Sequence, residues 1–241
     1  MGWLNKLRTV YDRQGAPQGA GKRSADARGL PGGRPGPAYA PRNGRLSNGL
    51  KDFLWYLDGI GRGTLLDLGP VWQTTVSFFL ERGFKVYTED LLLAWKEFLR
   101  AEEERLRALL PEEATPMLPA ARAETFLRGS LQYPAETFDA VLAWDLLDYL
   151  DNEMVTRVLA RLAVLLRDGG VVLAVFHSRR PEAFHRYRVL DDQHIELLPA
   201  PALFPVQRIY QNREILNLFS RFRTLKTFVG RDQLREGIFI K

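Results

Sequence analysis

Two carboxylate residues, Asp67 and Glu89, stand about twenty positions apart, and each lies at or near the end of a short apolar run. A further apolar segment with helical spacing, residues 76–80, lies between the two runs, so the order is strand, helix, strand. In such a unit the turn after the first strand lies against a nucleotide-like ligand. A carboxylate at the tip of the second strand can accept hydrogen bonds from both ribose hydroxyls. The spacing therefore predicts a nucleotide-like ligand beside Asp67 and Glu89.

The turn that follows Asp67 resembles the nucleotide-binding motif of class I S-adenosylmethionine-dependent methyltransferases. That family usually has an acidic residue followed by three alternating glycines, and here Gly69 stands at the first glycine position. Val71 and Gln73 occupy the second and third. Glycine is typical there because the backbone must come into contact with the methionine part of the cofactor. Two interpretations stay open: a functional loop whose path is set by Pro70, or a pocket that is partly closed.

A second block, residues 138–176, strengthens the resemblance. Residues 138–145 form a nearly continuous apolar run, as expected for a strand covered on both faces. Apolar positions at helical spacing follow over residues 152–167, then an Asp-Gly-Gly turn and another apolar run at 171–176. This order is similar to the fourth strand, its helix and the fifth strand of class I methyltransferases. The resemblance thus covers residues 47–180 in order.

The resemblance implies an α/β fold: a Rossmann-like, doubly wound, mostly parallel seven-stranded sheet with an antiparallel last strand and helices on both faces. Residues 222–228 and 237–240 would form the terminal hairpin. We also expect a third strand at residues 125–128 and a long amphipathic helix at 92–110. An inserted hairpin at about residues 186–198 is predicted to wall a substrate pocket.

The resemblance also implies S-adenosylmethionine as the cofactor and assigns these residues to its binding: Asp67, Gly69, Pro70, Glu89, Ser130 and Trp144. Glu89 stands where the family has its ribose-binding carboxylate, and Ser130 where many members have an aspartate near the adenine amino group. Trp144 could stack on cofactor or substrate, or attract the sulfonium through its ring face. Two alternatives stay open: Glu89 as a solvent-exposed acid at a strand end, and Trp144 as a core aromatic. The neighbouring Asp90 is expected to cap the next helix.

Two residues are candidates for catalysis. Asp145 ends the fourth predicted strand, where it could orient a nucleophile, act as a general base or begin a helix. His177 directly follows the fifth strand and could deprotonate an oxygen or nitrogen nucleophile, or be a surface histidine beside Arg179. The chain has no cysteine, and no two of its three histidines have the spacing of metal ligands on a helix, so no metal site is predicted.

The net charge of +5 is unevenly divided along the chain. Residues 1–51 hold ten Lys and Arg against two Asp, a charge of +8, whereas residues 52–241 hold 24 against 27, a charge of −3. Residues 14–46 are rich in Gly, Pro and Arg, and we expect a basic disordered linker there. The methyltransferase-like domain, residues 47–241, would then begin with Ser47 as a helix N-cap.

Residues 1–13 form a short amphipathic segment ahead of the linker, with apolar side chains such as Trp3, Leu7 and Val10 at helical spacing. Such a helix either folds back on its own domain or docks, through residues 1–45, onto an acidic protein partner or an anionic membrane surface. Arg179, Arg180, Arg186 and Arg188 form a local basic cluster that could receive an acidic substrate or a phosphate backbone. No nucleic-acid-binding motif accompanies them, so nucleic acid is not indicated as a partner.

Two functional hypotheses follow. The first is S-adenosylmethionine-dependent methyl transfer to an unidentified acceptor. The second is a catalytically inactive methyltransferase-like module that acts as a binding or scaffold subunit through its basic tail. The longest apolar run has about six residues, against the roughly 20 that cross a bilayer, and no signal-peptide core is present. We therefore expect a cytoplasmic protein, either free or peripheral to a membrane or larger complex.

Overall fold

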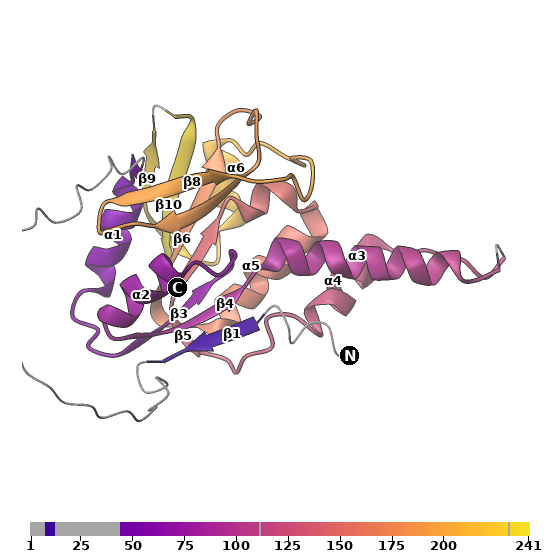
Figure 1. The fold of residues 1–241 in the computed structure, drawn as a ribbon, viewed down its shortest axis with the longest axis horizontal. Helices are drawn as coiled ribbons and strands as arrows, with labels where there is room; N and C mark the ends of the chain where they lie inside the picture. Colours follow the sequence, from indigo (N-terminus) through magenta and orange to yellow (C-terminus); the bar gives the residue numbers. More distant parts are fainter. Residues whose placement is uncertain (1–7, 13–43, 111, 231) are drawn as a thin grey trace, which may run out of the picture.

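The computed structural model describes residues 8–12, 44–110, 112–230 and 232–241, and its centre is a seven-stranded sheet (Figure 1). The strand order across the sheet is β1-β4-β3-β5-β6-β10-β9. These strands are β1 (Arg8–Tyr11), β3 (Gly63–Asp67), β4 (Phe84–Glu89), β5 (Phe138–Trp144), β6 (Leu166–His177), β9 (Arg223–Val229) and β10 (Leu234–Ile240). Strands β3, β4, β5 and β6 are parallel, and β10 is antiparallel to both β6 and β9. The predicted mostly parallel α/β sheet and its terminal hairpin are thus confirmed.

Helices cover both faces of this sheet, each through its own cluster of buried apolar side chains. One face is covered by α1 (Asn48–Leu57) and α2 (Gln73–Glu81). The other is covered by α3 (Leu91–Arg107), α4 (Pro119–Leu127), α5 (Asn152–Leu165) and α6 (Asn212–Leu218). Ser47 and Asp90 cap α1 and α3 as predicted, because each side chain accepts a hydrogen bond from a backbone N–H in the first turn.

Strand β5 lies in the middle of the sheet, and its burial explains its sequence. Phe138, Ala140, Val141 and Leu142 are completely buried, since helices pack on both faces. Each large apolar side chain buried in this way contributes about 1.5–3 kcal/mol relative to exposure. The carboxyl end of β5 is therefore a rigid place from which to position a functional side chain.

Residues 125–128, where a third strand was expected, lie instead at the end of helix α4. Pro119 occupies the first turn of α4, where its missing N–H costs no hydrogen bond. Ala123 and Phe126 point into the core from one face of the helix, and Glu124 pairs with Arg128 one turn later at 2.8 Å. The prediction was wrong because a short window with one aromatic residue does not distinguish a strand from a buried helix.

Strand β1 takes the sheet edge beside β4, and it comes from the N-terminal segment that was predicted to be helical. Arg8–Tyr11 pairs antiparallel with β4, with Arg8 opposite Glu89 and Tyr11 opposite Val86. The helix is therefore wrong for residues 8–11, although the segment does fold back on its own domain. Thr9, Val10 and Tyr11 are β-branched or aromatic, and the open edge of β4 supplies the hydrogen-bond partners. Residues 1–7 lie outside the described residues.

A second, three-stranded sheet consists of β2 (Arg45–Leu46), β8 (His194–Pro199) and β7 (His185–Val189), in that spatial order. Strands β7 and β8 are the inserted hairpin that the sequence predicts. Strand β2 shows that the folded part begins before Ser47, because Arg45 pairs with Asp232 and with the buried Glu236. The predicted linker falls mostly on residues 13–43, which lie outside the described residues.

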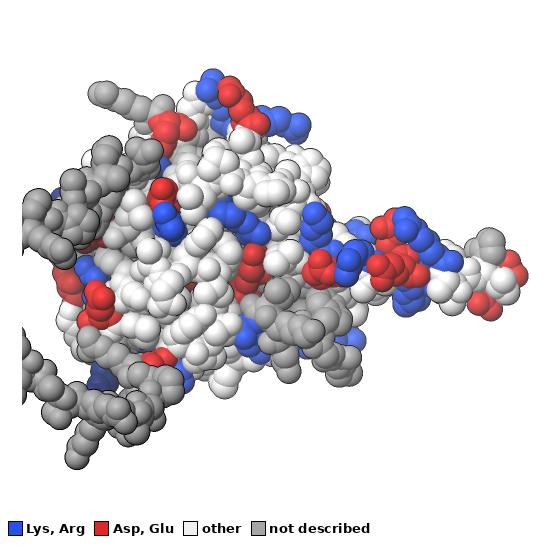
Figure 2. All heavy atoms as spheres, viewed as in Figure 1, with Lys and Arg blue, Asp and Glu red and all other residues white. Residues whose placement is uncertain are grey.

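Helix α3 projects from the body of the molecule (Figure 1), and it ends at Arg107, short of the predicted residue 110. Basic and acidic side chains alternate along its projecting part (Figure 2). Some of them pair along the helix, as Arg100 does with Glu97 at 2.9 Å. Among the residues that the structure describes, no helix is long and apolar enough to cross a membrane.

Candidate functional site

Four of the residues singled out in the sequence meet at one edge of the sheet. Asp67 and Glu89 end β3 and β4, while Trp144 and His177 end β5 and β6. Since these strands are parallel, their carboxyl ends lie at the same edge, which is where ligands bind in folds of this kind. All four side chains are buried, with 1–5 % of their surface exposed.

Asp67 is fixed by the turn that follows it. Its Oδ1 accepts a hydrogen bond from the backbone N–H of Gly69 at 2.9 Å and another from the indole N–H of Trp144 at 2.7 Å. Burial raises the pKa of Asp67 to about 7, although both hydrogen bonds act in the opposite direction. The carboxyl group is therefore in use within the chain, where it ties the end of β3 to the end of β5.

Trp144 covers the bare backbone of Gly69. A Cβ atom placed on Gly69 would lie 2.9 Å from the Trp144 ring, closer than real contacts allow. The indole is stacked on Tyr187 of β7, with 5.4 Å between ring centroids and 9° between ring planes. In the family that the sequence resembles, glycine at this turn lets the ligand approach. In this structure the same close approach is made by Trp144.

The two residues that depart from the glycine pattern do not fill the site. The side chain of Val71 is 44 % exposed, so it points outward. Gln73 begins α2, and its amide group donates to the hydroxyl of Ser77 at 3.0 Å. The closure of the site thus comes from Trp144, and Val71 and Gln73 contribute nothing visible to it.

Glu89 is engaged by three groups of the chain. Its Oε1 accepts from the backbone N–H of Leu131 at 2.9 Å, and its Oε2 accepts from the hydroxyl of Tyr133 at 3.0 Å. The guanidinium of Arg8, from strand β1, lies 3.3 Å from the same Oε2. Arg8 also lies over the Tyr133 ring, 4.5 Å from its centroid. The alternative that Glu89 is a solvent-exposed acid is therefore wrong, since only 3 % of its surface is exposed.

The acceptor groups at this edge fit the chemistry of a nucleoside. A carboxylate at the tip of β4 suits a ribose diol. Ser130, which is fully buried, has a hydroxyl with no hydrogen-bond partner among the described residues. In this structure, however, side chains of the protein cover the groups that a nucleoside would contact. The guanidinium of Arg8 pairs with one carboxylate oxygen of Glu89, and the ring of Trp144 lies against the backbone of Gly69. A nucleoside bound here requires both side chains to move.

His177 belongs to a second group of polar residues at the same edge. Its ring Nδ1 lies 2.9 Å from Oδ2 of Asp148, and its backbone N–H donates to the same oxygen at 2.7 Å. Its Nε2 lies 3.7 Å from Oδ2 of Asp145, which also accepts from the hydroxyl of Tyr187 at 2.9 Å. The structure therefore brings together the two catalytic candidates, Asp145 and His177. Asp145 also stands at the start of the short 3-10 helix η2 (Leu146–Tyr149), as one alternative expected, but its side chain makes no capping hydrogen bond.

Burial dominates the titration of this group. It raises the pKa of Asp145 to about 7 and also raises the pKa of Asp148, in both cases against the stabilising charge or hydrogen bond of His177. For His177, burial alone would lower the pKa. The hydrogen bond to Asp148 and the charges of Asp145 and Asp148 outweigh it, so the pKa is raised. The protonation of Asp145, Asp148 and His177 is therefore coupled.

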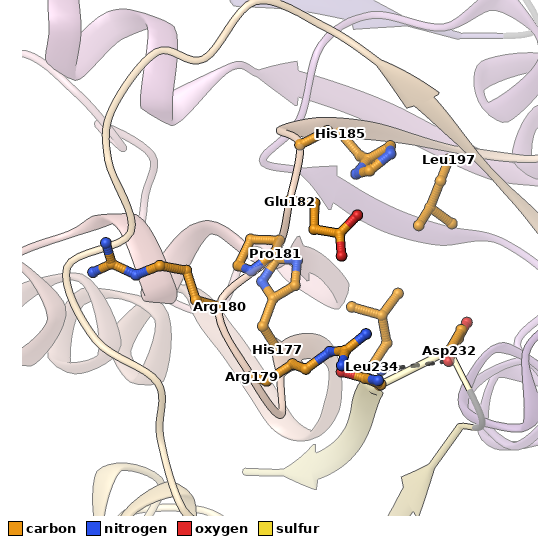
Figure 3. Close-up of a pocket in the computed structure, with 11 residues that line it drawn as sticks. His177, Arg179, Arg180, Pro181, Glu182, His185, Leu197, Asp232 and Leu234 are labelled. Atoms are coloured by element: carbon orange, nitrogen blue, oxygen red, sulfur yellow. Dashed lines mark hydrogen bonds between the residues drawn. The ribbon is translucent and has the colours of Figure 1, made fainter.

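A cavity of about 360 Å³ opens beside His177 (Figure 3). Its wall includes Arg179 and Glu182 from the segment after β6, His185 and Leu197 from the β7–β8 hairpin, and Leu234 from β10. The predicted basic cluster is not one patch. Arg186 pairs with Asp90 at 3.0 Å and Arg188 with Glu196 at 2.5 Å, so only Arg179 and Arg180 line this cavity.

Sequence reasoning missed Asp148, Tyr187, Tyr133 and Arg8. Asp148 carried a usable signal: it stands three residues after Asp145, in the short 3-10 helix η2 (Leu146–Tyr149), where residues three apart lie on one side. Tyr187 lies in the predicted hairpin, on the strand that faces the core. Arg8 carried no local signal, because its contact with Glu89 depends on pairing between segments about 80 residues apart in the chain.

Comparison with protein families agrees with this fold. The sequence model of the methyltransferase domain family matches residues 41–205, which is more than half of the chain. The chain therefore belongs to the methyltransferase domain family. Among curated proteins, none matches its sequence.

Several solved structures are similar to this chain at low identity. One is the 1,6-didemethyltoxoflavin N1-methyltransferase of Burkholderia thailandensis, with bound 1,6-didemethyltoxoflavin and S-adenosylhomocysteine (19 % identity, 80 % of this chain, 78 % of that chain, TM-score 0.45). A type 11 methyltransferase from Sulfolobus solfataricus has 16 % identity over 78 % of this chain and 90 % of its own, with a TM-score of 0.40. The glycopeptide N-methyltransferase MtfA, in complex with S-adenosylmethionine, has 15 % identity over 85 % and 99 %, with a TM-score of 0.39. The family assignment rests on the family model alone.

Proposed function

We propose that this protein transfers a methyl group from S-adenosylmethionine to an acceptor. The observation that carries the proposal is the family match over residues 41–205, together with Asp67 and Glu89 at the carboxyl ends of neighbouring parallel strands. The cofactor, when bound, supplies an activated methyl group on a sulfonium. The protein then has to bind and orient donor and acceptor and keep water out. The comparisons give no support to the alternative of an inactive scaffold.

The cofactor-binding residues proposed from the sequence keep these roles here. Glu89 would hold the ribose hydroxyls, and the backbone at Gly69 and Pro70 would lie against the methionine part. The unpartnered hydroxyl of Ser130 would serve the adenine. Asp67 would hold the turn in place through the N–H of Gly69.

Opening of the site is part of this proposal. Arg8 must leave Oε2 of Glu89 before a ribose hydroxyl can bind there, and Trp144 must leave Gly69. Trp144 is held by one hydrogen bond and one ring stack, both made by side chains, so its movement leaves the sheet intact. Tyr187, the other ring of that stack, donates to Asp145, which lies 3.7 Å from His177. We propose Asp145 and His177 as the residues that serve the acceptor.

Calorimetric titration with S-adenosylmethionine and S-adenosylhomocysteine tests the proposal. We expect wild-type protein to bind, and Glu89→Gln to bind about ten- to a hundredfold more weakly, because a charge-assisted hydrogen bond is worth about 1.5–3 kcal/mol. Glu104→Gln on the exposed face of α3 is the matched control and should bind as wild type does. If neither wild type nor Arg8→Ala binds either compound, the proposed function is wrong.

For residues 1–45 an acidic protein partner or an anionic membrane surface stays our proposal, and it now concerns residues 1–7 and 13–43. The described residues 8–11 and 45–46 are already paired within the domain. Salt-sensitive association with anionic vesicles, compared between the full chain and a chain that starts at Gly44, tests it. Equal association of the two proteins would show that the segment has no such role.

A further inference from the structure

We propose that the cavity beside His177 is the acceptor site, and that it takes a small aromatic acid whose hydroxyl gives its proton to Nε2 of His177. This inference rests on the proposed function and names the acceptor class for it. It stands on the orientation of His177, on the charges around the cavity, and on the apolar part of its wall.

Asp148 determines which nitrogen of His177 is free. Its Oδ2 accepts from both the backbone N–H and the ring Nδ1–H of His177, at 2.7 and 2.9 Å. Asp148 is completely buried, so this contact cannot be exchanged for water. The ring is thereby held as the tautomer that has its proton on Nδ1, with the lone pair on Nε2. Asp148 is a positioning residue in this scheme, and His177 is the group that touches the acceptor.

The surroundings of Nε2 leave it able to receive a proton. Asp145 lies 3.7 Å away, too far for a good hydrogen bond, and is itself bonded to Tyr187. The Tyr149 ring stands edge-on to the imidazole, and its hydroxyl has no hydrogen-bond partner among the described residues. Besides these, the titratable and charged groups on the cavity wall are Arg179, Arg180, Glu182, His185 and Asp232.

The cavity wall carries charges of both signs, and one of its cations can receive a carboxylate. Asp232 is already paired with Arg45, whereas neither Arg179 nor Glu182 has an ion-pair partner within the described part of the chain. Arg180 points away from the other labelled side chains in Figure 3, and its guanidinium donates to the carbonyl of Val206 at 3.3 Å. Arg179 is therefore the cation available to a carboxylate.

The acidity of the hydroxyl limits the acceptor further. A phenol has a pKa near 10, and the raised pKa of the His177 imidazole brings the two groups closer in acidity, which favours proton transfer. An alkanol is far less acidic, so His177 would deprotonate it poorly. Leu197 and Leu234 supply an apolar surface for an aromatic ring, and a cavity of about 360 Å³ holds a molecule of this size. A hydroxylated aromatic acid meets all three conditions.

The proton step is balanced within the chain and the acceptor. The O–H bond of the acceptor breaks, an N–H bond forms at Nε2, and the electron pair stays on the oxygen. The resulting imidazolium is stabilised by Asp148 on one side and by Asp145 on the other. The step needs neutral His177, so it becomes more effective as the pH rises through the pKa of that residue.

Proton NMR of the three histidines tests the proposal without any turnover. The probe is 4-hydroxybenzoate at millimolar concentration, with benzoate and phenol as probes that lack one of the two groups. We expect 4-hydroxybenzoate to shift the His177 ring signals and to bind about tenfold more tightly than either control probe. His194, paired with Asp191 outside the cavity wall, is the internal control. No shift of His177 with any probe would overturn the proposal.

Matched variants test which side chain binds the carboxylate and which one orients His177. Arg179→Gln should weaken 4-hydroxybenzoate about tenfold, whereas Arg213→Gln, on the exposed face of α6 and outside the cavity wall, should bind as wild type does. Asp148→Asn should lower the pKa of His177 in the same NMR titration, which a merely structural residue would not do. Equal effects of the two arginine variants, or an unchanged His177 titration in Asp148→Asn, would contradict the assignment.

The two proposals can fail separately. If the protein binds S-adenosylmethionine and 4-hydroxybenzoate leaves His177 unshifted, the acceptor site is wrong and the proposed function stands. If His177 responds to the probe and no cofactor binds to wild type or Arg8→Ala, the cavity is a binding site and methyl transfer is wrong.

Discussion

The two halves of the candidate site differ in how their polar atoms are used. On the side of Asp67 and Glu89, the carboxylates are bonded by the turn, by Leu131 and Tyr133, and by Arg8. On the side of His177, buried Oδ1 of Asp148 and the hydroxyl of Tyr149 have no partner within the described residues. Unsatisfied buried polar atoms are costly and rare. The comparison teaches that the carboxylates of the first half are covered by the chain itself, so we call it the closed half, although the hydroxyl of Ser130 there also has no partner among the described residues. In the second half the unpartnered atoms belong to Asp148 and Tyr149, which both contact His177.

The largest effect is expected where the closed half is broken. Glu89→Ala leaves Arg8, Tyr133 and the N–H of Leu131 without their acceptor, and we expect the free energy of unfolding to fall by about 3–5 kcal/mol. His177→Gln keeps a hydrogen-bond donor for Asp148, so this variant should lower the free energy of unfolding by only about 1 kcal/mol. Urea unfolding of both variants checks this. Equal losses would mean that the two halves do not differ in this way.

A smaller effect is expected where the N-terminal strand is removed. If residues 1–45 were only a docking segment and a linker, a chain beginning near Leu46 would keep its melting temperature. The structure changes that expectation, since β1 covers the edge of β4 and Arg45 pairs with Glu236. We now expect a lower melting temperature, by about 2–4 °C for each kcal/mol lost. An unchanged value in a thermal melt of the shortened chain would show that β1 adds no stability.

Arg8→Ala should open the closed half with little damage. Freed from Arg8, Oε2 of Glu89 should bind the ribose more readily, and we expect S-adenosylmethionine affinity to rise about tenfold, or 1.4 kcal/mol. Glu89 keeps its bonds to Leu131 and Tyr133, and the Arg8 side chain is partly exposed, so the lost ion pair should cost about 1 kcal/mol of stability. Calorimetry measures the first effect, with Thr9→Ala on the same strand as control. A weaker affinity in Arg8→Ala would make Arg8 part of the binding site.

Asp67 makes the stability of the closed half depend on pH. Because burial raises its pKa from 3.8 to about 7, the folded protein holds a proton that the unfolded chain has released. The protonation of Asp67 therefore makes its full contribution to the free energy of unfolding below pH 3.8, and this contribution is lost as the pH rises toward 7. Asp67→Asn should remove this slope while keeping an acceptor for Gly69 and Trp144. Urea unfolding of both proteins between pH 4 and 8 checks it, and parallel curves would contradict it.

The smallest effect is expected from restoring the glycine pattern. Val71→Gly with Gln73→Gly removes side chains that point outward, so cofactor affinity should stay the same while stability falls by about 0.5–1 kcal/mol per glycine. If Val71 and Gln73 closed the pocket, as one interpretation of the sequence allowed, the two glycines would instead raise the affinity. A clear gain in affinity by calorimetry would show that Val71 or Gln73 obstructs it after all.

The sequence predicted what depends on local pattern and on parallel strand order. Asp67, Glu89, Trp144 and His177 were placed at one edge because each follows an apolar run, and parallel runs end together. The closure could not be predicted in this way, since Arg8 reaches Glu89 through long-range pairing. Trp144 was weighed as a ligand-contacting or a core residue. The structure shows a buried ring that lies on the glycine turn itself, which neither alternative describes fully.

Strand β1 at one edge of the large sheet and β2 on the small sheet are joined by residues 12–44, so this stretch is tethered at both ends. A single cut within it would turn β1 into a separate peptide held by four residues of pairing. The effective concentration that covalent linkage gives to β1 would be lost, which favours its dissociation even though Arg8 also contacts Glu89 and Tyr133. The edge of β4 would then be free to pair with another chain. An intact stretch between β1 and β2 thus keeps the backbone edge of β4 paired within the protein.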